Sequence, residues 1–172
     1  MVKNRFLLIA VMLLLTLLNS GSTGIETSSL LFKIGRSKDS NEIIYLANTV
    51  RNEQLNPGNP ITPYWRKQTS GNIKESLTWI QQKYAYGLKY ISKSDQNAIF
   101  QFVSYNKRNF ELKKKRNGEY AVFTLSGKEE VEVHRIFIQI DGGTFWVPKI
   151  SRVELHATAV NSRKPLIEII IP

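Results

Sequence analysis

The sequence contains no cysteine among its 172 residues. This absence excludes a disulfide scaffold, a thiolate zinc or iron–sulfur site, a cysteine nucleophile and a lipid anchor on cysteine. The packed core alone must therefore stabilise the fold, and a chain of this length can bury most of its apolar surface in one domain. Apolar residues make up 42% and charged residues 22% of the chain, which is typical of a globular protein.

The motifs of the common enzyme classes are also missing. There is no Gly-x-Ser-x-Gly nucleophile elbow, no His-Glu-x-x-His zinc motif, no Gly-rich phosphate-binding loop with Lys-Ser or Lys-Thr, and no Gly-x-Gly-x-x-Gly motif. We therefore identify no catalytic residue, and we expect no cofactor and no metal. An enzyme whose catalytic groups meet only in the folded chain stays open.

The first 24 residues have the order of a secretory signal peptide. A lysine and an arginine within the first five residues precede 13 residues of which only Thr16 is polar, and small polar residues follow. The apolar run is short for a permanent membrane span, which needs roughly 20 residues. We predict cleavage after Ser22 or Gly24, with an uncleaved anchor as the alternative, and no transmembrane span in the mature chain. The protein is then exported, periplasmic or extracellular, and its lack of disulfides favours a bacterial source.

Acidic residues are fewer than basic ones. The chain has 24 lysines and arginines and 14 aspartates and glutamates, which gives a formal net charge of +10. Two basic segments, residues 107–108 and 113–116, contribute to this excess. They could attract an anionic lipid or polysaccharide of the cell envelope. The alternative is that these lysines keep a hairpin tip soluble and an edge strand unpaired. Because an exported protein rarely meets nucleic acid, we expect no nucleic-acid partner.

After the leader, the apolar residues recur mostly with period two, which predicts β-strands. We expect strands over residues 30–34, 43–50, 61–66, 88–92, 98–105, 110–116, 119–125, 131–141, 144–160 and 166–171. Asn117-Gly118 and Gly142-Gly143 are typical of two-residue hairpin turns, and such short links require antiparallel pairing. The sequence therefore predicts a mainly β fold over residues 25–172. It would be a single antiparallel β-barrel or a two-layer β-sandwich of about eight to ten strands.

One α-helix is expected to be inserted into this fold at about residues 73–86. Four apolar residues lie on one stripe at helical spacing: Ile73, Leu77, Ile80 and Tyr84. Asn72 with Glu75 is typical of a capping box at the start, and Gly87 of a cap at the end.

Three stretches carry a resemblance to a known family: IGRSKDSNEIIY over residues 34–45, NPITPYW over 59–65 and LTWIQQKYAYG over 77–87. Together they resemble a family of small exported bacterial proteins described as a domain of unknown function. The resemblance covers the chain from about residue 31 onward. It implies an exported single domain, and it implies no activity, cofactor or catalytic residue.

The loop between the first two expected strands is a candidate binding site. Its polar residues are Arg36, Ser37, Lys38, Asp39 and Asn41. Guanidinium, hydroxyl and ammonium groups on a tight turn suit a carboxylate or phosphate. The alternative is an ordinary solvated turn, in which Asp39 and Asn41 bond to nearby amides.

A cluster of aromatic residues is the second candidate site. Trp79 and Tyr86 lie nearly opposite the Tyr84 stripe of the expected helix, and Trp65 precedes that helix. Exposed aromatic rings can stack on sugars or other flat ligands. The alternative is that Trp65 and the irregular stretch 52–60 cover this face of the helix.

His134 and His156 are the only histidines, so a histidine metal site or base would have to use them. If Gly142-Gly143 is a two-residue turn, the two histidines lie five pairs apart, roughly 17 Å at about 3.4 Å per residue, and on opposite faces. We therefore expect no shared metal site. A bulge introduced by Pro148 would change this parity.

The sequence favours a non-enzymatic exported module that binds a ligand or an envelope partner, an anionic one included. Its contact surface would combine the Arg36 loop with the aromatic helix surface. One alternative is a lipocalin-like carrier of a small apolar ligand inside the barrel. The other is an enzyme acting on an envelope polymer, with Asp39, His134 or a glutamate pair converging in a cleft.

Overall fold

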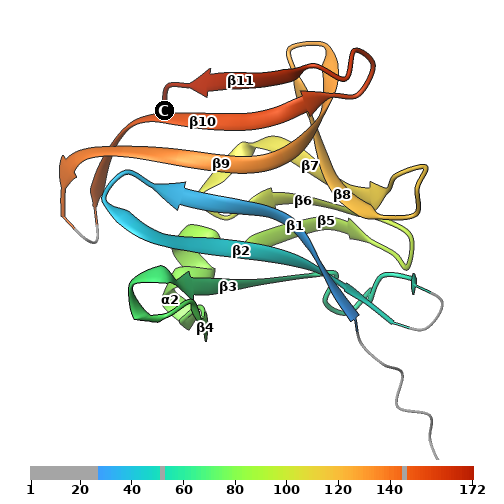
Figure 1. Ribbon diagram of the computed structural model, residues 1–172, viewed down its shortest axis with the longest axis horizontal. Coiled ribbons are helices and arrows are strands. Elements are labelled where there is room, and N and C mark those ends of the chain that lie inside the picture. The colour runs from blue at the N-terminus through green and yellow to red at the C-terminus, as the bar shows by residue number, and fades with distance from the viewer. Residues whose placement is uncertain (1–26, 51–52, 145–146) are drawn as a thin grey trace, which may run out of the picture.

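The computed structural model describes residues 27–50, 53–144 and 147–172 (Figure 1). The expected leader over residues 1–24 and its cleavage sites lie outside the described residues. The fold is mainly β with one short helix, which confirms the predicted fold class. Among the described residues, no helix is both long and apolar enough to cross a membrane.

In the part of the chain that the structure describes, eleven strands belong to one sheet. They are β1 (Thr27–Arg36), β2 (Asp39–Thr49), β3 (Ile61–Lys67), β4 (Ile73–Ser76), β5 (Leu88–Lys93), β6 (Ala98–Phe102), β7 (Tyr105–Lys114), β8 (Tyr120–Ser126), β9 (Glu129–Gly143), β10 (Pro148–Ala159) and β11 (Pro165–Ile170). The helical segments are the 3-10 turn η2 (Gln68–Ser70), the single turn α2 (Trp79–Gln81) and the π-helical η3 (Gln82–Tyr86).

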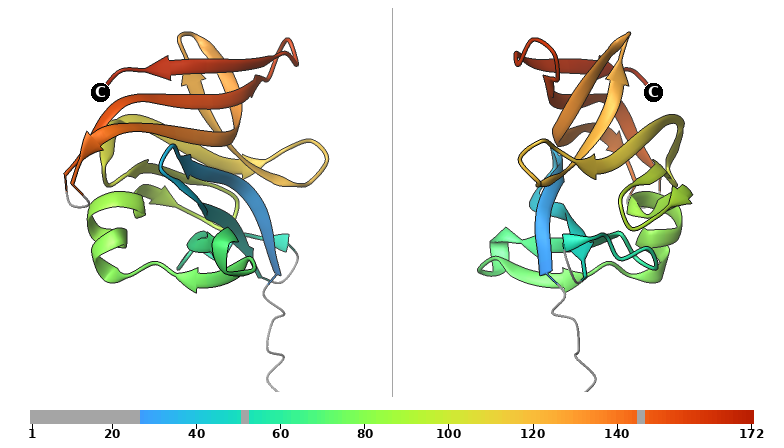
Figure 2. Two further views of the ribbon diagram at one scale, coloured as in Figure 1. Left: turned by 60° about the vertical axis from the view of Figure 1, so that its left-hand side comes forward. Right: turned by 90° about the vertical axis from the view of Figure 1, so that its right-hand side faces the viewer.

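β9 has two different neighbours along one of its edges. Its first residues pair antiparallel with β8, whereas residues 135–138 pair in parallel with β1. β10 pairs antiparallel with the other edge. The other strand pairs among the described residues are antiparallel, as predicted. The sheet therefore forks at β9 into a branch of β1–β4 and a branch of β5–β8, and it curls into a half-barrel (Figure 2).

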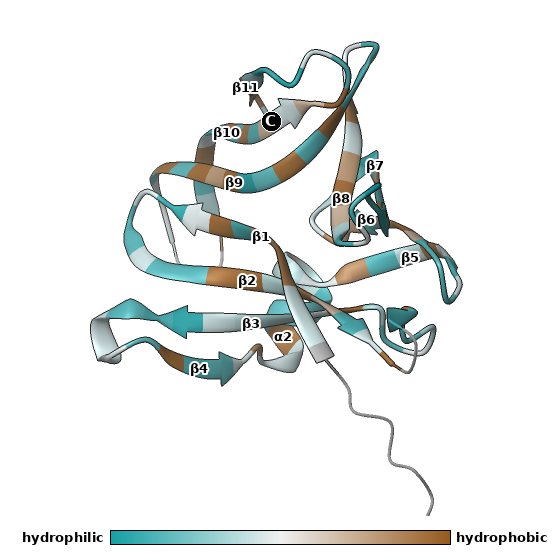
Figure 3. Ribbon diagram, turned by 45° about the vertical axis from the view of Figure 1, so that its right-hand side comes forward, coloured by the Kyte–Doolittle hydropathy of each residue, from teal (hydrophilic) through white to brown (hydrophobic). Residues whose placement is uncertain are grey.

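Aromatic side chains fill the space between the two branches. The rings of Phe32 and Tyr45, on β1 and β2, stack with centroids 4.4 Å apart. Phe102 of β6 meets both rings edge-on, at 6.0 and 5.9 Å. Such edge-to-face contacts add to the free energy of area burial. In the first half of β9, hydrophilic residues alternate with the buried Val131 and Val133, as expected for a strand with one face toward this core (Figure 3).

The helix is shorter than predicted and begins later. Residues 73–76 form β4 and pair with β3, so their backbone groups bond to a strand rather than to a helical turn. Asn72 has a φ of 62°, a left-handed conformation that does not suit an N-cap. Thr78 caps the helix instead, because its hydroxyl accepts from the Gln81 N–H at 3.3 Å while the Gln81 side chain accepts from the Thr78 N–H at 2.9 Å. The prediction of one apolar stripe along this helix is also wrong, since Tyr84 is 61% exposed.

The prediction of a two-residue turn at Gly142-Gly143 is also wrong. The predicted spacing of the two histidines depended on that turn, so it is wrong too. Gly143 pairs with Pro148, so the loop is wider and the register of β9 with β10 is shifted. His156 pairs with Arg135, and the next β10 residue pairs with Val133, which leaves His134 in a bulge. The His134 ring lies 2.9 Å from the Thr158 hydroxyl. Since Thr158 is two residues from His156, both histidines lie on the same face and close together.

Candidate functional site

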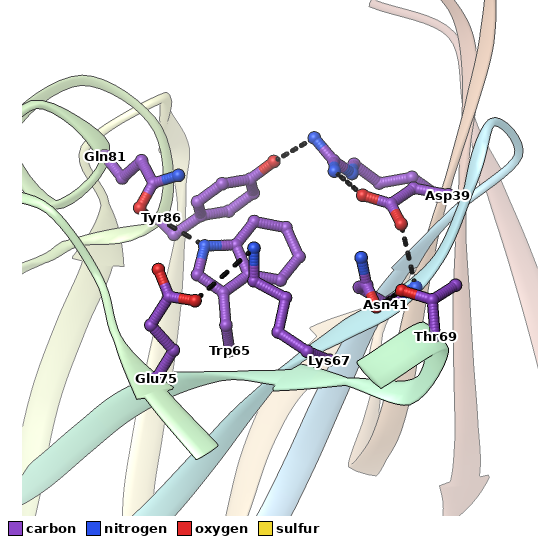
Figure 4. Close-up of polar contacts among 9 residues, drawn as sticks. Asp39, Asn41, Trp65, Lys67, Thr69, Glu75, Gln81 and Tyr86 are labelled. Carbon is purple, nitrogen blue, oxygen red and sulfur yellow. Dashed lines mark hydrogen bonds and ion pairs between the residues drawn. The ribbon is translucent and has the colours of Figure 1, made fainter. Parts of the chain in front are cut away.

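Arg36 lies at the centre of a cluster formed by the β1–β2 hairpin, β3 and the end of η3. Its Nη1 donates a hydrogen bond of 3.0 Å to the Tyr86 hydroxyl, and its Nη2 forms an ion pair with Asp39 (Figure 4). The guanidinium carbon lies 4.9 Å from the centroid of the Trp65 ring, within the range of a cation–π contact. We call Arg36, Asp39, Trp65 and Tyr86 the Arg36 cluster.

Trp65 connects this cluster to the short helix. The ring is 4% exposed, its Nε1 donates to the Gln81 side chain at 3.2 Å, and it meets Tyr86 edge-on at 5.6 Å. Gln81 belongs to the capping box described above, so one amide joins the helix cap to the sheet. The Arg36 cluster therefore docks α2 and η3 against β3.

The tyrosines near this cluster have raised pKa values. Burial raises the pKa of Tyr86, and the neighbouring Arg36 counteracts part of that increase. Burial raises the pKa of Tyr45 more strongly, and its hydroxyl donates to the Tyr86 carbonyl at 2.7 Å. Both hydroxyls are consequently protonated at neutral pH, and they act as hydrogen-bonding groups rather than as bases.

The other residues of the predicted loop site have separate surroundings. Ser37 extends the β1–β9 pairing, since its hydroxyl accepts from the Ile140 N–H at 2.9 Å. Asp39 accepts from the Asn41 N–H at 2.9 Å, the local bond expected for an ordinary turn. Lys38 is exposed at the tip. Because Asp39 already neutralises Arg36, the loop offers a bound anion less positive charge than its sequence indicates.

Trp79 lies apart from the Arg36 cluster and forms a second aromatic group with Tyr84. The two side chains are 67% and 61% exposed, and their ring centroids are 6.5 Å apart. The Lys83 amine lies 5.8 Å from the Trp79 ring and 5.2 Å from the Tyr84 ring. The structure thus brings Arg36, Trp65 and Tyr86 together and presents Trp79 separately to solvent.

A cavity of about 170 Å³ opens into the half-barrel, and of the candidate binding residues predicted from the sequence only Tyr86 lies in its walls. Its walls come from both branches of the sheet and from the end of η3, and apolar side chains dominate them: Ile34, Phe102, Phe110, Ile136, Ile138, Val153, Leu155 and Ile170. Polar groups are few, chiefly those of Ser104, Tyr105, Tyr86 and Arg108. The inward positions of each strand could be identified by alternation, but their convergence on one cavity depends on the fork at β9.

Arg108 and Glu168 form an ion pair beside the cavity, between β7 and β11. Nη1 donates to Oε2 at 2.9 Å, and Nη2 bonds to the other carboxylate oxygen. This bidentate contact lowers the pKa of Glu168 and raises that of Arg108. Arg108 therefore acts within the fold rather than as part of an exposed basic segment.

Two lysines of the second basic segment, residues 113–116, form ion pairs with glutamates. Lys113 lies 2.6 Å from Glu130, and Lys115 lies 3.1 Å from Glu132. A groove of about 670 Å³ runs between these residues and the β10–β11 turn. Since acidic and basic side chains share its walls, the groove carries less positive charge than the sequence run suggests. Within the described residues, no group of three or more histidines, aspartates and glutamates is arranged to hold a metal ion.

Comparison with known proteins identifies the family of the chain. Residues 32–169 match the model of a family described as "Domain of unknown function (DUF4833)", which confirms the resemblance carried by the three sequence stretches. No curated protein and no solved structure matches the chain.

Proposed function

The chain belongs to the DUF4833 family of unknown function, and from the geometry of its half-barrel we propose that it is a non-enzymatic module that binds a small, neutral apolar ligand. The ligand would occupy the apolar cavity, as in a lipocalin-like carrier. The predicted leader implies that this binding takes place outside the cytoplasm.

The cavity is the observation that supports this proposal. An apolar cavity of about 150 Å³ can stay dry and bind benzene, so the 170 Å³ here suits one aromatic ring or a short alkyl chain. Its walls are built from elements that the forked sheet holds in place, which favours a preformed site over one that forms on binding.

The ion pair beside the cavity favours a neutral ligand. Glu168 already neutralises the charge of Arg108 through a bidentate ion pair, so Arg108 offers a ligand carboxylate little net electrostatic attraction. An incoming anion would also approach the Glu168 carboxylate, whose lowered pKa keeps it ionised at neutral pH. We therefore expect an alcohol or hydrocarbon to bind more tightly than the carboxylate of the same chain length.

Titration with 1-hexanol and with hexanoate, followed by amide chemical shifts in NMR spectra, tests this function. The variant Val153→Trp fills the cavity, whereas the matched control Val147→Trp adds the same side chain at a position that is 74% exposed. We expect hexanol to shift the amide signals of cavity residues in the wild type and in Val147→Trp. Its affinity for Val153→Trp should be lower by about tenfold or more. Equal binding to Val153→Trp, or no binding of hexanol to the wild type, would contradict the proposal.

A second candidate function rests on the exposed ring pair of Trp79 and Tyr84. Two neighbouring aromatic side chains that are both more than half exposed can stack on a sugar ring of an envelope polymer. Quenching of tryptophan fluorescence by an oligomer of N-acetylglucosamine tests it. Trp79→Ala should abolish the response, and Ile91→Ala, which removes an exposed apolar side chain from β5, should retain it.

A further inference from the structure

β11 forms a free edge of the sheet. In the part of the chain that the structure describes, β11 pairs with β10 alone, and it lies at the top of the molecule in Figure 1. A strand of this kind presents a row of backbone N–H and C=O groups that another strand can pair with.

The register identifies the residues whose backbone groups face that edge. In an antiparallel pair, alternate residues direct both backbone groups toward the partner strand. The Ala159 N–H donates to the Lys164 carbonyl at 2.9 Å, and β11 follows in the same register without a bulge. Leu166, Glu168 and Ile170 therefore bond to β10. The intervening Ile167, Ile169 and Ile171 direct their N–H and C=O groups outward.

The side chains of the same three isoleucines are exposed on one face. Ile167 is 58%, Ile169 61% and Ile171 71% exposed. Glu168 lies on the other face, where Arg108 holds it. The outer face of the segment is thus apolar along its whole length.

The other two terminal strands carry the charges that usually prevent edge pairing. β4 includes Lys74 and Glu75, and β5 includes Lys89 and Lys93. Between Pro165 and Pro172, β11 and the residue after it carry one charged side chain, and that side chain is already paired. Pro165 is on the outward parity and has no N–H to donate, so it limits the unprotected edge at the start of β11.

We propose that β11 pairs antiparallel with β11 of a second copy of this chain, around a two-fold axis that passes beside Ile169. In this register Ile169 faces Ile169 of the second copy, and Ile167 faces Ile171 in both directions. All three outward residues then form hydrogen-bonded pairs, with two bonds in each pair. Six isoleucines meet on the outer face, so the surface is complementary to itself, as a two-fold interface must be.

The neighbouring registers are less favourable. A shift that centres the axis on Glu168 places the two Glu168 side chains opposite each other and sets Pro165, which lacks an N–H, against Ile171. A shift toward Ile170 leaves Ile167 without a partner residue in the segment. The register centred on Ile169 is the one that uses the whole edge.

Cysteine cross-linking tests this pairing directly, because the chain has no cysteine of its own. Ile169→Cys should form a disulfide-linked dimer under mild oxidation, since the paired Cα atoms would be about 5.5 Å apart. Ile167→Cys and Ile171→Cys, mixed, should cross-link to each other better than either does to itself. Ile73→Cys, at a 58% exposed position on β4, is the matched control and should stay monomeric.

Light scattering on the full chain provides the second measurement. The wild type and Ile73→Lys should have twice the mass of one chain, and Ile169→Lys should have the mass of one chain. A monomeric wild type together with Ile169→Cys that cross-links no faster than Ile73→Cys would overturn the proposal. A mixture of Ile167→Cys and Ile169→Cys that cross-links faster than Ile169→Cys alone would overturn the register.

Discussion

The Arg36 guanidinium donates a hydrogen bond of 3.0 Å to the Tyr86 hydroxyl, across 50 residues of sequence. The bond joins the first hairpin to the end of the π-helical segment. Tyr86 also lines the apolar cavity, so the Arg36 cluster holds one wall of the proposed ligand site. This arrangement gives Arg36 a structural role that its place in a polar loop did not indicate.

Removal of the Tyr86 hydroxyl should therefore destabilise the fold. Tyr86→Phe leaves an Arg36 N–H without its acceptor in a partly buried site, which costs about 1–2 kcal/mol of the free energy of unfolding. Urea denaturation followed by circular dichroism measures it. Tyr84→Phe is the control, because that side chain is 61% exposed, and its stability should match the wild type. Equal stability of both variants would remove the structural role of the bond.

The two helix-associated tryptophans should differ sharply in their effect on stability. Trp65→Ala empties a site that is 4% exposed and should cost about 3–5 kcal/mol of the free energy of unfolding. Trp79→Ala removes a ring that is 67% exposed and should change stability by less than about 0.5 kcal/mol. Thermal unfolding of both variants measures this difference in stability. A large loss in Trp79→Ala would mean that Trp79 supports the fold, and it would weaken the proposal that Trp79 is a contact surface.

Gly87 is required where η3 returns to the sheet. A Cβ at this position would lie 1.8 Å from the Gln82 carbonyl oxygen, which is closer than any real contact. Gly87→Ala should therefore displace the π-helical segment and cost about 2 kcal/mol or more. Gly58→Ala is a matched control, because its Cβ would meet only the Asn56 side chain at 3.2 Å. Chemical denaturation of both variants measures the free energy of unfolding. A loss in Gly87→Ala as small as that in Gly58→Ala would contradict the requirement for glycine at position 87.

Local sequence patterns predicted the strands well and the helix start poorly. Leu30, Phe32 and Ile34 recur at every second position and lie in a strand, because period two is a property of the strand itself. Ile73 fitted a helical stripe, but a partner strand was available at the edge of β3, and pairing with it outweighed the local preference. The true cap was present in the sequence as Thr78 and Gln81, three residues apart, and it competed with the similar pair at Asn72.

Features that depend on several distant segments could not be predicted from the sequence. The cavity requires the parallel junction of β1 with β9, and the Arg36–Tyr86 bond joins residues 50 positions apart, so no local pattern encodes either feature. The histidine spacing was wrong for a similar reason. One wider loop and one bulge at His134 change the register, and neither leaves a distinct local signal.

Glu42 should make the stability of the fold depend on pH. Its carboxylate is 9% exposed and lies between Lys33, at 2.8 Å, and Arg66. Burial alone would raise the pKa of Glu42, but the hydrogen bonds and charges of Lys33 and Arg66 outweigh burial and hold the pKa below its ordinary value of 4.5. A carboxyl whose pKa is lower in the folded state stabilises that state when it is ionised. This contribution is complete above the ordinary pKa and is lost as the pH falls through the folded value.

Glu42→Gln isolates this contribution. At neutral pH the variant should lose about 1–3 kcal/mol of the free energy of unfolding, because two charged hydrogen bonds are weakened. In acid well below pH 4.5 the difference from the wild type should shrink, since the wild-type carboxyl becomes protonated as the pH falls. Glu75→Gln is the matched control, because Glu75 is 57% exposed and lies 3.6 Å from Lys67, so its effect should be near zero at both pH values. A loss in Glu42→Gln that is the same at both pH values would show that shape and packing, rather than the charge of Glu42, stabilise this part of the sheet.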